Sequence, residues 1–147
     1  MILHTASESI TFTKKLENDS ATFYEELAQR FGKDAEMFLF FARENKKNVA
    51  QIERTYYEVI TDAIEGCFAF DIESDDYIFQ IMIPEGVSYT EILNRALGIE
   101  NKIIKFYTYA ANQSRDLMAD IPRVFIMIAR KREERRLKLG LLLKNET

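Results

Sequence analysis

Apolar residues recur at three- and four-residue intervals in four segments of the chain, which is the spacing of an amphipathic helix. Thr5 and Ser88 each precede one of these segments and have a glutamate three residues later, as in a capping box. Asp34 is a suitable N-cap for another segment, and Pro122 lies in the first turn of the last one, where proline is tolerated. The pattern therefore predicts helices over residues 6–31, 34–61, 88–112 and 120–142.

The links between these helices differ in length, and this difference predicts how the helices are arranged. Gly32 and Lys33 join the first two helices, and residues 113–119 join the last two, so each pair should form an antiparallel hairpin. Residues 62–87 form a much longer link, which a crossover running back along the bundle would explain. We expect its apolar run, Tyr77–Ile83, to pack in extended form against the helices and to be the place for a short edge strand.

The composition agrees with a single helical domain spanning residues 1–147. Hydrophobic residues make up 47% of the chain, and its five glycines and two prolines are too few for a β fold of many strands. The formal net charge of −4 gives no electrostatic reason to expect binding to nucleic acid or to a membrane. The first residues lack the basic-then-apolar order of a signal peptide, so we expect a cytoplasmic protein.

Metal sites built from cysteine or from paired histidines are excluded by the amino-acid counts. The chain has one cysteine, Cys67, whereas a rubredoxin-type iron site needs four thiolates. It also has one histidine, His4, so no site can take two histidines from one chain.

Polar residues interrupt each apolar stripe at a similar height in the predicted bundle. Glu17 lies seven residues before Tyr24, on the same helix face, and Glu100 stands in the same relation to Tyr107. The second and fourth helices carry polar residues at stripe positions too: Asn45, Asn48, Arg132 and Arg135.

A buried carboxylate is costly unless it is paired or bound to a metal, so Glu17 and Glu100 need partners. Arg132 and Arg135 supply two positive charges against the two negative charges. Arginine keeps its charge when buried and can hold a carboxylate through two hydrogen bonds, while the asparagine amides can satisfy further donors and acceptors. We therefore expect a central polar layer of salt bridges and amides in place of a metal centre.

The two halves of the chain are similar to each other around these glutamates. Residues 16–24 and 99–107 both contain an apolar residue, then Glu-Asn, then Phe-Tyr at the same offset. With the duplicated hairpin and the long crossover, this Glu-x5-Phe-Tyr pattern resembles the rubrerythrin-like branch of the ferritin-like superfamily. The resemblance covers all four helices and implies an all-α, ferritin-like antiparallel four-helix bundle. Members of that family typically hold two irons at the centre of the bundle.

The ligand pattern implied by this resemblance is incomplete in this chain. Glu17 and Glu100 match the family's two single glutamates. Where the second helix should show Glu-x-x-His, residues 45–48 read Asn-Lys-Lys-Asn, and where the fourth should show it, residues 132–135 read Arg-Glu-Glu-Arg. Four of the six ligands are thus missing. The resemblance implies a degenerate di-iron site, and we expect no metal cofactor.

A different helix register would give a different site. Rotation by about 100° would bring Glu44 or Glu133 inward. Together with Glu17 and Glu100 they would then form an all-carboxylate site suited to iron or manganese. The protein would in that case be a di-metal oxidoreductase or peroxidase.

Three functions are therefore open at the level of sequence. The chain could be a non-catalytic structural or partner-binding bundle, a metal-dependent oxidoreductase, or a helical module for dimerisation alone. We favour the first, with the exposed aromatics of the crossover or an outer helix face as the binding surface. We also expect a homodimer, because bundles of this type commonly pair.

Overall fold

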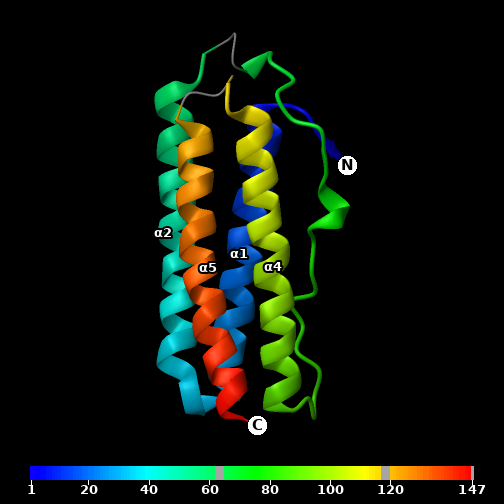
Figure 1. Ribbon diagram of the computed structural model, residues 1–147, viewed down its shortest axis with the longest axis vertical. Helices are drawn as coiled ribbons and strands as arrows, with labels where there is room; N and C mark the ends of the chain where they lie inside the picture. The colour runs from blue at the N-terminus through cyan, green and yellow to red at the C-terminus, as the bar shows by residue number, and fades with distance from the viewer. Residues whose placement is uncertain (62–64, 117–119, 147) are drawn as a thin grey trace.

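The computed structural model describes residues 1–61, 65–116 and 120–146. Within these residues four long helices lie side by side along the length of the molecule (Figure 1). None of the described helices is both long enough and apolar enough to cross a membrane. The helices are α1 (Ala6–Arg30), α2 (Ala35–Val59), α4 (Tyr89–Ser114) and α5 (Ile121–Asn145). The prediction of four helices is confirmed, and the last one extends three residues beyond its expected end.

Most of the predicted helix-start signals act as expected. Thr5 accepts a hydrogen bond from the backbone of Glu8, and the Glu8 carboxylate accepts one from the backbone of Thr5, which completes a capping box. Ser88 caps α4 by accepting the backbone N–H three residues later. Asp34 precedes α2, but its side chain makes no capping bond, because it accepts a hydrogen bond from the Tyr89 hydroxyl instead. That bond ties the start of α2 to the start of α4.

The helices pack as two antiparallel hairpins. α1 packs along α2 through a short 3-10 turn, η1 (Gly32–Asp34), and α4 packs along α5. α2 also contacts α5, which brings the two hairpins together. Between α2 and α4 the chain returns along the outer side of α4 for the length of the bundle (Figure 1). This return is the crossover that the length of the link predicted.

The crossover is held by the N-terminal residues. Strand β1 (Ile2–Leu3) pairs antiparallel with β2 (Ile72–Glu73), which is followed by the 3-10 turn η2 (Ser74–Asp76). The edge strand that we expected within Tyr77–Ile83 was therefore placed wrongly. It forms earlier in the crossover because the N-terminal residues provide backbone partners there. Residues 77–83 pack on the helices without regular structure, and alternate side chains along them are turned towards the bundle.

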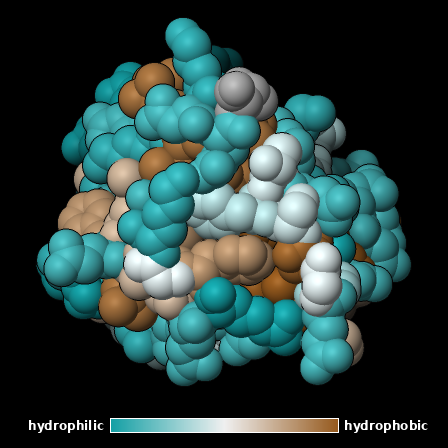
Figure 2. All heavy atoms as spheres, turned by 90° about the horizontal axis from the view of Figure 1, so that it is seen from below, coloured by the Kyte–Doolittle hydropathy of each residue, from teal (hydrophilic) through white to brown (hydrophobic). Residues whose placement is uncertain are grey.

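Apolar side chains fill the bundle on both sides of its central polar layer. Figure 2 views the molecule along the bundle from the end at which α5 finishes, and shows hydrophobic atoms in a band between hydrophilic ones. Phe31, Tyr89 and Leu143 lie at the helix ends here and pack against the core, with the Phe31 and Tyr89 rings 5.2 Å apart. Aromatic and aliphatic side chains thus separate the polar layer from solvent at this end of the bundle.

Candidate functional site

Eight residues singled out in the sequence lie in one buried layer across the four helices. Each has at most 1% of its surface exposed. Each lies on the inner face of its helix because its stripe neighbours are apolar and are buried in the same direction. The eight residues are Glu17 and Tyr24 on α1, Asn45 and Asn48 on α2, Glu100 and Tyr107 on α4, and Arg132 and Arg135 on α5.

Arg132 lies at the centre of this layer and bridges the two glutamates. Its Nη2 atom donates to Glu17 Oε2 at 2.7 Å, and its Nη1 atom donates to both oxygens of Glu100 at 2.8 and 2.9 Å. Nη2 also donates to Asn45 Oδ1 at 3.0 Å, and Nη1 donates to Ser20 Oγ at 3.3 Å. One guanidinium group therefore joins residues from all three other helices.

The two tyrosines complete the coordination of the glutamates. Tyr24 donates its hydroxyl proton to Glu100 Oε2 at 2.7 Å, and Tyr107 donates to Glu17 Oε2 at 2.8 Å. Burial and the Glu100 carboxylate raise the pKa of Tyr24 well above its usual value, and burial and the Glu17 carboxylate do the same for the pKa of Tyr107. Both phenols are therefore held in their protonated, donating form.

The asparagines connect the remaining groups. Asn48 Nδ2 donates to Glu17 Oε1 at 2.9 Å. Asn45 Nδ2 donates to Ser20 Oγ at 3.0 Å, while its Oδ1 accepts from Arg135 Nη1 at 2.9 Å. Ser20 is a member that we did not single out in the sequence. Its position three residues after Glu17, at stripe spacing, is the signal that would have identified it.

Arg135 links the layer to the surface. Its Nη2 atom donates to Glu44 Oε1 at 2.8 Å and to the backbone carbonyl of Phe41 at 3.1 Å. Its guanidinium carbon lies 4.7 Å from the centroid of the Phe41 ring and 5.3 Å from that of Tyr24. Glu44 has 20% of its side chain exposed, so it adds a partly hydrated negative charge to the two buried ones. From the sequence we expected the charges of two glutamates and two arginines to balance. The structure adds Glu44 to this group as a fifth charged residue.

The protonation state of Glu100 follows from these contacts. Burial alone would raise the pKa of its carboxyl group. The charges of Arg132 and Arg135, with hydrogen bonds from Arg132 and Tyr24, outweigh burial and lower that pKa below its usual value. The same pairing raises the pKa of Arg132 against the opposing effect of its burial. The contact between Arg132 and Glu100 is therefore an ion pair and not a neutral hydrogen bond.

These residues do not fit the di-iron group that the family resemblance implies. All four carboxylate oxygens of Glu17 and Glu100 already accept hydrogen bonds from the network. Arg132 and Arg135 occupy positions at which the resemblance implies metal ligands, and a guanidinium group has no lone pair to offer a cation. Within the described parts of the chain, no group of three or more His, Cys, Asp or Glu side chains is arranged to hold a metal ion.

The all-carboxylate alternative required a rotated helix register, which the structure does not show. Glu133 lies on the exposed face of α5, because its neighbours Arg132 and Arg135 take the inward positions. Glu44 does approach the layer, but it does so as the ion-pair partner of Arg135. The four carboxylates therefore do not converge on one point.

No protein-family model matches this chain, and comparisons with curated proteins and with solved structures give no match either.

Proposed function

We propose that this chain is a ferritin-like bundle of the rubrerythrin-like type in which an ionic network replaces the di-iron site, and that it acts as a non-catalytic structural or partner-binding protein. The observation that carries the proposal is the position of Arg132. Its guanidinium group pairs with both Glu17 and Glu100, the residues that match the family's two single glutamates. A fixed organic cation thus takes the place in which metal cations would neutralise these carboxylates.

The protonation of the layer supports a structural role. A general acid or base works best with a pKa near the working pH. Here the pKa values of Tyr24 and Tyr107 are raised far above that range, and the pKa of Glu100 is lowered. These groups are also fully buried and take part in hydrogen bonds between helices, so they stabilise the packing of the helices against one another.

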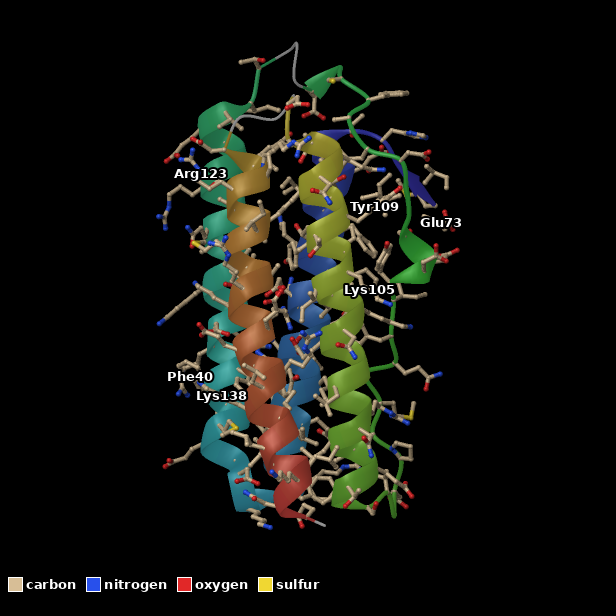
Figure 3. The ribbon with its side chains drawn as sticks, in the orientation of Figure 1. Phe40, Glu73, Lys105, Tyr109, Arg123 and Lys138 are labelled. Carbon is tan, nitrogen blue, oxygen red and sulfur yellow. The ribbon has the colours of Figure 1, made fainter. Side chains whose placement is uncertain are left out.

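The outer face of α2 and α5 is the surface that we assign to a partner. Phe40 on α2 and Leu137 and Leu141 on α5 are large apolar residues, and all three are exposed. Lys138 lies with its Nζ atom 5.3 Å from the centroid of the Phe40 ring, so the two helices share the surface (Figure 3). Exposed apolar residues that gather into a contiguous patch mark protein contacts. We assign this face to a second copy of the chain in a homodimer, which sedimentation of Leu137→Glu beside the unaltered protein would test.

Iron uptake by a restored variant tests the core of the proposal. The substitutions Asn45→Glu, Asn48→His, Arg132→Glu and Arg135→His would rebuild the six-ligand pattern of the family. We expect this variant, exposed to ferrous iron without oxygen, to bind about two irons per chain. The unaltered protein should bind none at stoichiometric level. Adding Glu17→Ala to the restored variant should remove the uptake.

The opposite results would separate the two parts of the proposal. Iron uptake by the unaltered protein that is lost in Glu17→Ala would support the di-metal oxidoreductase and overturn the metal-free role. A restored variant that is helical by circular dichroism and yet binds no iron would argue against the ferritin-like assignment itself.

A further inference from the structure

A groove lies between the crossover and α4, on the side of that helix that faces away from the polar layer. It has a volume of about 510 Å3, which is within the range of sites for small ligands. Glu100 on α4 is directed into the bundle, whereas Gly98, two residues earlier, lies on the outer face and lines the groove. The groove is thus separate from the network and does not depend on the proposal for that site.

The middle of the groove is apolar and is open because of a glycine. Ile99 and Phe79 line it from α4 and from the crossover, together with Ile78. A Cβ atom at Gly98 would meet no other atom within 4 Å, so a side chain at this position would extend into the open space. Glycine is less favourable than alanine in a helix interior, and no packing contact at Gly98 requires it.

A cation lies at each end of this apolar stretch. Arg95 and Lys102 are seven residues apart on α4, which places them on one face and roughly 10 Å apart along the helix axis. Arg95 Nη1 donates to the Met82 carbonyl at 2.9 Å, and Lys102 Nζ donates to the Ile78 carbonyl at 3.0 Å. These bonds hold both cations beside the groove and leave further N–H donors on each group.

Neither cation is neutralised by a carboxylate within the described residues. Other described cations, such as Lys105 and Arg130, also form no ion pair, so what distinguishes Arg95 and Lys102 is that both line the same groove. Lys105 continues the basic side of α4 one turn beyond Lys102, towards Tyr109 (Figure 3). Along its length the groove therefore has the Arg95 cation at one end, an apolar floor in the middle and the Lys102 cation at the other end.

We propose that this groove binds a small molecule with two carboxylate groups joined by an unbranched apolar chain. One carboxylate would pair with the Arg95 guanidinium through two hydrogen bonds, and the other with the Lys102 ammonium group. The chain between them would cover Gly98 and Ile99. The separation of the two cations selects a medium-chain dicarboxylate over a short one, and the second cation selects it over a monocarboxylate.

Titration of the full-length protein with nonanedioate, followed by the amide shifts of α4 in two-dimensional NMR, tests the proposal. We expect saturable shifts at Gly98 and its neighbours, with nonanoate binding about tenfold more weakly and butanedioate weaker still. Gly98→Leu should abolish binding by filling the groove while it leaves both cations in place. Gly140→Leu is the matched control, because Gly140 is also a helical glycine whose Cβ would meet no atom within 4 Å.

Lys102→Met provides a second test that does not alter the floor of the groove. It should reduce the affinity for nonanedioate to that for nonanoate, and leave the affinity for nonanoate unchanged. The proposal is overturned if nonanedioate causes no saturable shifts, if Gly98→Leu binds as tightly as the unaltered protein, or if both ligands bind equally well. Those outcomes leave the proposal for the central network untouched, since iron uptake does not involve this groove.

Discussion

The hydroxyl group of Tyr24 donates a 2.7 Å hydrogen bond to the carboxylate of Glu100, a residue 76 positions later in the chain. Tyr107 donates in the same way to Glu17, at 2.8 Å. Each tyrosine thus binds the glutamate of the other hairpin, and not the glutamate seven residues before it on its own helix. Because each tyrosine binds the glutamate of the other hairpin, the polar layer connects the two hairpins, with Arg132 at its centre.

Tyr24→Phe should therefore weaken the contact between the hairpins. The substitution keeps the ring in the core and removes one donor from a buried carboxylate, which costs about 1–3 kcal/mol of unfolding free energy. Urea unfolding followed by circular dichroism measures this cost. Tyr57→Phe is the matched control, because Tyr57 is exposed and should change the free energy by less than about 0.5 kcal/mol. Equal effects of the two substitutions would mean that the buried hydroxyl contributes nothing specific.

Arg132→Leu should cause a larger loss. It leaves Glu17 and Glu100 buried at the centre of the bundle without their shared cation, and such a break typically costs about 3–5 kcal/mol. Arg130→Leu, on the exposed face of the same helix, should have little effect. Thermal unfolding of the two variants measures the difference. An Arg132→Leu protein as stable as the Arg130→Leu protein would contradict the central position of this guanidinium group.

The sequence predicted the inner face of each helix well, and the reason is physical. Periodicity reports which side of a helix is buried, so the polar residues at stripe positions, such as Asn45 and Arg132, were placed on inner faces from spacing alone. Periodicity does not report which helix lies opposite. The pairing of Tyr24 with Glu100 depends on how the two hairpins are apposed, and no spacing within one helix contains that information.

Two further features of the structure could not be predicted from the sequence, for related reasons. Glu44 lies beside the inner stripe, and it joins the network because the long side chain of Arg135 reaches it at the edge of the bundle. The pairing of β1 with β2 involves two residues on each side, which is too short to leave an alternating pattern. Both depend on contacts between segments distant in sequence.

Acid should destabilise the protein through Glu100. The pKa of this group is lower in the folded protein than in the unfolded chain, so its stabilising contribution is present above the unfolded value of about 4.3 and is lost as the pH falls through the folded value. The unfolding free energy, measured by urea titration between about pH 6 and about pH 3, should therefore fall more steeply for the unaltered protein than for Glu100→Gln. Parallel curves would show that Glu100 does not titrate with a lowered pKa.

Leu3→Ala should loosen the crossover before it affects the helices. Leu3 is buried and pairs with Ile72, and the adjacent backbone bonds join the Phe70 amide to His4 and the Ser74 amide to Met1. Truncating a buried leucine lowers stability by about 2–5 kcal/mol. We expect this loss to appear mainly as more frequent local opening of the crossover. Hydrogen exchange should become faster at the Phe70 and Ser74 amides and stay slow within α5. Leu137→Ala, at an exposed position, is the control and should change neither. Uniform acceleration of exchange along the chain would instead show that the crossover and the bundle open as one cooperative unit.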